Sequence, residues 1–191
     1  GKSLNIFINS GGGSVFAGLA IYQMIKRFSE NCSVKVYVDG LAGSIASVIA
    51  FAGSEPPKIP ANAFLMIHNP WAEAEGNAEE LRKMADDLDV IAAGMMNVYM
   101  ENVKDGITED QIKELMAEET WMNGTQAAEY FNITVTDQNP EAAVPGEYVA
   151  SCKKIPKDMK ILKVTNSSDN STREANRIEE NKKRDAIARI I

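Results

Sequence analysis

The start of the chain changes its hydrophobic period at a run of glycines. Residues 4–9 form a short apolar stretch that ends at Ser10 and the triplet Gly11 to Gly13. From residue 14 onward apolar side chains recur every three or four positions, at Val15, Leu19, Tyr22, Ile25 and Phe28. This pattern predicts a buried strand, a tight turn and a helix over residues 14–29 that is capped by Ser14. A chain that begins in this way is restricted to folds in which strands alternate with helices.

The same alternation continues along the chain. Residues 34–38 are rich in β-branched side chains and predict a second strand, and residues 43–52 are mostly small and predict a helix buried on nearly every side. A third apolar run, residues 63–68, predicts another strand, and residues 133–135 predict a last one. Strands separated by helices predict an α/β fold with a parallel sheet and right-handed crossovers.

A long helix is predicted after Gly76. Asn77 and Glu80 have the spacing of a capping box, and apolar residues then recur at alternating steps of three and four for about 25 residues. The stripe consists of Leu81, Met84, Leu88, Ile91, Met95 and Val98. Because the other faces are charged, we expect part of this helix, with its stripe, to pack against another subunit. A single long core helix is the alternative. Two further capping boxes predict helices that begin at Thr108 and Asn123.

Composition divides the chain into one domain and a polar tail. With 191 residues, 45% of them apolar, the chain is long enough for one domain with a sizeable core. We expect the domain over residues 1–138, and a polar, basic tail of linker and weak helix over residues 139–191. Residues 1–150 carry 9 basic and 21 acidic side chains, and residues 151–191 carry 11 and 6. The acidic body argues against nucleic-acid binding.

The sequence shows no pattern of a membrane or secreted protein. No window approaches ~18 consecutive apolar residues, and no secretory signal pattern is present in the sequence given. The two cysteines, Cys32 and Cys152, are too few for a disulfide framework and have no second pair that would complete a zinc site. We therefore expect a cytoplasmic protein that contacts no membrane and holds no metal.

Two side chains with catalytic chemistry follow predicted strands. His68, the only histidine, stands at the carboxyl end of the third strand, where ligands collect in open α/β sheets. Ser44 stands where the second strand gives way to a helix, among small residues that let a substrate backbone approach. Each has a structural alternative: a histidine that only makes hydrogen bonds, and a serine that only allows close helix packing.

The glycine turn adds a third feature to the same edge of the sheet. Its backbone N–H groups suit an oxyanion or a phosphate. The spacing of Gly11 to Gly13 does not match a dinucleotide fingerprint, so no nucleotide cofactor is expected. Since the carboxyl ends of neighbouring parallel strands lie together, the turn, Ser44 and His68 are predicted to form one site.

Four segments together resemble the proteolytic subunit of Clp proteases, and more closely the Clp-like proteases encoded near phage head genes. They are Ile8-Asn9-Ser10-Gly11-Gly12-Gly13, Gly40-Leu41-Ala42-Gly43-Ser44-Ile45-Ala46-Ser47, Met66-Ile67-His68-Asn69-Pro70, and Glu119-Thr120-Trp121-Met122 followed by Ala127-Ala128-Glu129-Tyr130, and the likeness spans residues 3–137. The resemblance implies a Clp-protease/crotonase-like α/β fold. It also implies Ser44 as nucleophile, His68 as general base, and the backbone N–H groups of Gly13 and Ile45 as oxyanion donors.

The resemblance identifies the third member of the catalytic triad less directly. Where the family has an aspartate, this chain has Glu119, a longer carboxylate that can still orient an imidazole. Asp137 is the alternative. The family also has residues before the first strand, so we expect a chain that begins at Gly1 to be a processed or truncated form.

The resemblance implies a serine endopeptidase that needs no cofactor and cleaves peptides or proteins inside an oligomer. The family forms heptameric rings, commonly stacked in pairs through the long helix, which protrudes as a handle, and works with an unfoldase ATPase. A role in phage or prophage head maturation or in protein turnover follows from the same likeness. Two other functions are kept as alternatives: a ring-forming structural subunit without activity, and a crotonase-like acyl-CoA enzyme.

Overall fold

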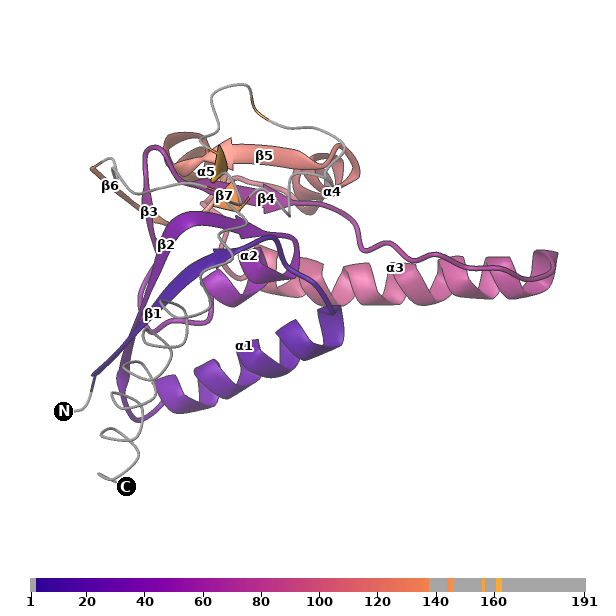
Figure 1. Cartoon of the computed structure of the whole chain (residues 1–191), viewed down its shortest axis with the longest axis horizontal. Helices are drawn as coiled ribbons and strands as arrows, with labels where there is room; N and C mark the ends of the chain where they lie inside the picture. Colours follow the sequence, from indigo (N-terminus) through magenta and orange to yellow (C-terminus); the bar gives the residue numbers. More distant parts are fainter. Residues whose placement is uncertain (1–2, 138–143, 146–155, 157–160, 163–191) are drawn as a thin grey trace, which may run out of the picture.

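The computed structural model describes residues 3–137, 144–145, 156 and 161–162 of the chain (Figure 1). Its elements are β1 (Ser3–Ser10), α1 (Val15–Ser29), β2 (Ser33–Gly43), α2 (Ile45–Ala50), β3 (Lys58–Pro60), β4 (Phe64–Ile67), α3 (Ala78–Met100), α4 (Glu109–Ala117), β5 (Thr120–Asn123), α5 (Gly124–Tyr130), β6 (Thr134–Thr136), β7 (Val144–Pro145) and β8 (Ile161–Leu162). Most of the tail expected at residues 139–191, with Cys152, lies outside the described residues.

The main sheet has the order β5-β4-β2-β3-β6, and β1 pairs with β2. The pairs β1–β2, β2–β3, β2–β4 and β3–β6 are parallel, which confirms the α/β class and the parallel core of the sheet. The strand β5 was not predicted from the sequence, and it runs antiparallel to β4 at the edge of this otherwise parallel sheet. The reason is visible where β4 ends: the N–H of Asn69 donates to the carbonyl of Met116 in α4 at 3.1 Å. The chain therefore re-enters the sheet at the end where β4 leaves it.

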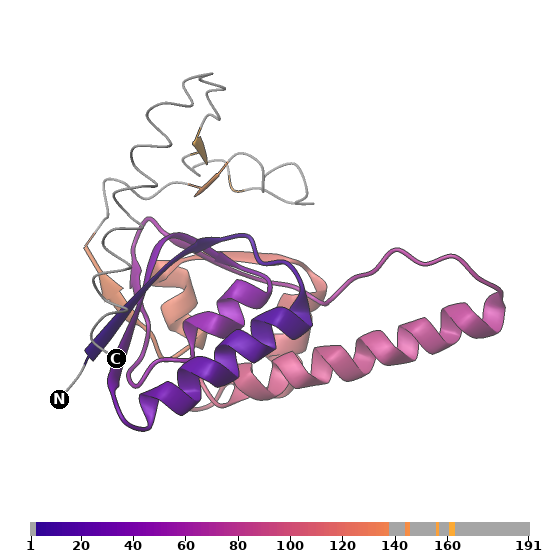
Figure 2. The same ribbon diagram turned by 60° about the horizontal axis from the view of Figure 1, so that its bottom comes forward.

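Helices α1 and α2 lie on one face of this sheet (Figure 2). Their approach is close, because a Cβ added at Gly18 of α1 would overlap the side chain of Ile45 in α2. As its small residues predict, α2 is buried along nearly its whole length. The alternating side chains Val34, Val36 and Val38 of β2 are buried in the same core. The body of the protein is thus built around β2 and α2, the two elements that meet at Ser44.

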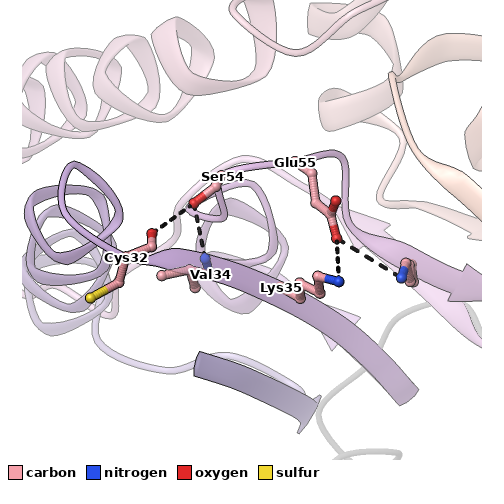
Figure 3. Close-up of polar contacts among 6 residues, drawn as sticks. Cys32, Val34, Lys35, Ser54 and Glu55 are labelled. Atoms are coloured by element: carbon pink, nitrogen blue, oxygen red, sulfur yellow. Dashed lines mark hydrogen bonds and ion pairs between the residues drawn. The ribbon is translucent and has the colours of Figure 1, made fainter. Parts of the chain in front are cut away.

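A small polar cluster fixes the start of β2 (Figure 3). The hydroxyl of Ser54 accepts from the N–H of Val34 at 2.9 Å and donates to the carbonyl of Cys32 at 3.3 Å, while the N–H of Ser54 donates to the carbonyl of Val34 at 2.9 Å. Glu55 lies 4.0 Å from Lys35 and 3.9 Å from the ammonium group of a second lysine, at position 58. The ion pairs are partly exposed and contribute little stability. The hydrogen bonds hold the turn before β3 against β2.

The handle helix α3 extends away from the body (Figures 1 and 2). Its capping box is formed by Asn77 and Glu80, as predicted. The last two turns are packed into the core, with Met95 and Tyr99 at 0% exposure, whereas residues 78–87 are all exposed. The alternative of a helix buried in the core along its whole length is therefore wrong for the outer half. In the part of the chain that the structure describes, no helix has the length and apolar character to cross a membrane.

Candidate active site

Ser44 occupies the turn between β2 and α2 in an unusual backbone conformation. Its φ is 54° and its ψ is −130°. A non-glycine residue held in a sparsely populated conformation costs of order 1–3 kcal/mol, and such residues concentrate at functional sites. The N–H of Ser44 donates to the carbonyl of Met66 at 2.9 Å, and its own carbonyl accepts from the N–H of Ser47 at 3.0 Å. Both backbone groups of the residue are therefore held by neighbouring elements.

The glycine turn after β1 packs directly on Ser44. Gly12 has φ 98°, and a Cβ at this position would lie 2.7 Å from the Cβ of Ser44 and 2.8 Å from the carbonyl oxygen of Gly43. Only glycine satisfies both the conformation and the contact. Gly13 has φ 146° and faces open space. The turn thus lies beside Ser44, as its place after a neighbouring strand predicts.

The register of β2 and β4 brings His68 close to Ser44 at the same edge of the sheet. Gly43 pairs with Met66, so the residues that follow the two strands are neighbours at the same edge of the sheet. The Nε2 of His68 lies 2.7 Å from the Oγ of Ser44, within hydrogen-bond distance. The two residues that sequence analysis singled out independently are therefore in contact.

The antiparallel strand β5 brings Glu119 to the same edge. Ile67 pairs with Thr120, so the next positions along this ladder are His68 and Glu119. Glu119 is 8% exposed and has φ 51°, a second strained residue at the site. Asp137 is exposed and follows β6, which lies at the opposite end of the sheet order from β5.

Ser44, His68 and Glu119 line one cavity of about 270 Å³. Its other lining residues are Gly11, Gly13, Val15, Leu41, Met66, Pro70, Trp71 and Trp121. The apolar part of this wall could not be identified from the sequence, because its members come from four separate segments. Trp71 is 67% exposed although it borders the cavity, so it offers an apolar surface to an incoming molecule. Among the described residues, no three His, Cys, Asp or Glu side chains gather in a way that would hold a metal ion.

This arrangement has the chemistry of an activated hydroxyl. An imidazole nitrogen at 2.7 Å from a serine Oγ is placed to accept the hydroxyl proton and so to generate a nucleophile. A buried carboxylate beside the imidazole is the third component of the triad arrangement that recurs on unrelated folds.

Comparisons with known proteins show which family the chain belongs to. The Clp protease family model matches residues 1–134, which include Ser44, His68 and Glu119. The ATP-dependent Clp protease proteolytic subunit of Bacteroides fragilis is 31% identical over 132 residues, 68% of this chain and 61% of that protein. The subunits of Bacteroides thetaiotaomicron and Porphyromonas gingivalis are 30% and 29% identical, cover 68% of this chain in each case, and are themselves covered to 58% and 57%. This chain spans about three fifths of the length of these relatives. By its match over residues 1–134, the chain belongs to the Clp protease family.

Proposed function

We propose that this chain is the catalytic subunit of a serine endopeptidase. The observation that carries the proposal is the 2.7 Å separation of Ser44 Oγ and His68 Nε2 in a cavity bounded by a glycine turn. A serine held at positive φ between a strand and a helix is a second, independent support, because the strain has no use in a merely structural turn.

We propose the following roles, which are supported by the contact between Ser44 and His68 and, for the oxyanion donors, by the family resemblance. The Nε2 of His68 takes the proton of Ser44 as the Oγ attacks a peptide carbonyl carbon, and it later gives that proton to the leaving amine. The imidazole must carry its other proton on Nδ1 to act in this way. The resulting acyl-enzyme is hydrolysed by water, with His68 again as base. The N–H groups of Gly13 and Ile45 stabilise the oxyanion that forms at each stage.

We assign the orienting carboxylate to Glu119. It is buried and lines the cavity. It directly precedes Thr120, the residue of β5 that pairs with Ile67, and so lies level with His68. The exposed Asp137 follows the strand at the other end of the sheet order. A carboxylate in the position of Glu119 would hold the Nδ1–H tautomer and stabilise the imidazolium that forms during the reaction.

The exposed half of α3 supports self-association. Leu81 is 44% and Met84 39% exposed on a helix that projects from the body, and such a stripe needs an apolar partner. We propose that the partner is α3 of a second copy. A heptameric ring, an unfoldase ATPase and a role in phage head maturation or protein turnover stay predictions that rest on the family resemblance. A cytoplasmic location stays a prediction that rests on the sequence pattern and the cysteine count.

A fluorophosphonate probe tests the proposal on the full chain. We expect peptide mapping to find the label on Ser44, and we expect Ser44→Ala to abolish both labelling and peptide hydrolysis. Ser33→Ala, at an exposed position in β2, is the matched control and should change neither. Hydrolysis should slow as the pH falls and His68 becomes protonated, because imidazolium cannot accept the serine proton. Labelling of Ser10, or a rate that is constant from about pH 5 to 8 in folded protein, would contradict the assignment.

A further inference from the structure

A buried chain of hydroxyl groups connects the handle helix to the backbone of Ser44. The hydroxyl oxygen of Tyr99, in the inner part of α3, lies 2.7 Å from the Oγ of Ser47 in α2. The Oγ of Ser47 in turn donates to the carbonyl oxygen of Ser44 at 2.5 Å. Both side chains are fully buried, at 0% exposure. Tyr99, which is 52 positions from Ser47 in the sequence, is thus connected to the backbone of Ser44.

The direction of the chain is fixed by the acceptor at its end. A carbonyl oxygen only accepts, so the single proton of the Ser47 hydroxyl points to Ser44, and the Tyr99 hydroxyl must donate to Ser47. Burial raises the pKa of Tyr99, which keeps that donor proton in place. The ring of Tyr99 is held edge-on to Phe51, with centroids 6.5 Å apart, and is tilted against Phe131 at 5.9 Å. The donor therefore has little freedom to turn away.

The carbonyl that receives these hydrogen bonds belongs to the same peptide plane as the N–H of Ile45. In a trans peptide the C=O and N–H point in opposite directions, so a carbonyl held by Ser47 directs the Ile45 N–H away from the buried hydroxyl pair. The N–H of Ser47 donates to the same carbonyl at 3.0 Å and adds to this restraint. Hydrogen bonds to a carbonyl also polarise the peptide group and strengthen its N–H as a donor.

We propose that Ser47 and Tyr99 are positioning residues that hold the 44–45 peptide plane, so that the N–H of Ile45 is fixed as an oxyanion donor. This inference rests on the proposed peptidase function. Two buried hydroxyls also satisfy one another, and a purely structural pair would affect stability alone. A measurement of kcat therefore distinguishes the positioning role from the structural one, and an unfolding measurement does not.

The test compares Ser47→Ala, Tyr99→Phe and the double variant on a short fluorogenic peptide. The matched control is Tyr22→Phe, because Tyr22 is 3% exposed and its hydroxyl is buried with no hydrogen-bond partner among the described residues. We expect kcat to fall by about tenfold to a hundredfold in each variant, less than the ~10²–10³ loss when an oxyanion donor is removed outright. KM should stay within about twofold, and the double variant should be no slower than the slower single one, because the two residues act as a unit.

The outcomes separate this inference from the proposed function. If the unmodified chain does not react with a fluorophosphonate, the peptidase function fails and the positioning role fails with it. If it reacts, and folded Ser47→Ala and Tyr99→Phe proteins keep the unmodified kcat, only the positioning role is refuted. A loss of kcat with a shifted pH profile would place the disturbance at His68 and would also refute it. Should Ser47→Ala fail to fold, Tyr99→Phe, which keeps the ring packed on Phe51 and Phe131, decides alone.

Discussion

Replacement of Gly12 by alanine tests whether the glycine turn positions the reactive serine. The new methyl group would lie 2.7 Å from the Cβ of Ser44 and 2.8 Å from the carbonyl oxygen of Gly43, so one partner must move. A side chain at φ 98° also carries a backbone cost of about 1–2 kcal/mol. Overpacking of this kind adds about 1–3 kcal/mol. We expect a total loss of about 2–5 kcal/mol in the free energy of unfolding, which most domains of this size survive.

Gly106→Ala provides a matched control for the backbone cost. Gly106 has φ 89°, close to that of Gly12, but nothing lies within 4 Å of an added Cβ. It should lose only the backbone part, about 1–2 kcal/mol, with no change at the site. Urea unfolding measures both variants, and the difference between them isolates the steric contribution.

The rate of fluorophosphonate labelling reports the consequence for the site. Because misplacement by about 1 Å can cost a hundredfold in rate, Gly12→Ala should label at least about tenfold more slowly, whereas Gly106→Ala should label at the unmodified rate. If both variants lose the same stability and label equally fast, the contact between Gly12 and Ser44 has no role in catalysis and the reasoning fails.

Two further sets of substitutions test the proposed roles of Glu119 and of the outer part of α3. Glu119→Gln should lower kcat by about three to four orders of magnitude, as loss of an orienting carboxylate does elsewhere, and Asp137→Asn should leave it unchanged; the reverse result in steady-state peptide hydrolysis would move the assignment to Asp137. Leu81 and Met84 are both exposed in the subunit. The double variant Leu81→Lys, Met84→Lys should abolish self-association, measured by light scattering, without lowering the thermal unfolding temperature. The control Asp86→Lys, on the other side of α3, should still self-associate. A monodisperse monomer of the unmodified chain at micromolar concentration would refute assembly through this helix.

The local elements were predictable because their signals are local. Ser14, Asn77, Thr108 and Asn123 each cap the helix that their sequence context predicts, since a capping side chain reaches only its own first turn. The strand β3 (Lys58–Pro60) was missed, because its three residues include a lysine and a proline and form no apolar or β-branched run.

The sequence predicts the site only where the carboxyl ends of neighbouring strands can be placed together without knowledge of the tertiary structure. The meeting of Ser44 and His68 follows from parallel strands in one sheet. The place of Glu119 depends on the reversed direction of β5, which no local pattern indicates. The contact of Ser47 with Tyr99 depends on how α3 packs against α2, two elements separated in the chain by strands β3 and β4. Tertiary packing, and not the pattern of any one segment, determines both.

The hydrogen bond from the N–H of Asn69 to the carbonyl of Met116 ties the chain next to His68 to helix α4. It anchors the residue that directly follows His68, while the exposed residues 71–77 lead out along α3 to its outer end (Figure 2). We expect a displacement of the outer part of α3 to be taken up in that exposed segment before it reaches His68, because Asn69 is held by α4. Residues 72–77 are therefore the place where an insertion or a change in handle length leaves the hydroxyl and imidazole in register.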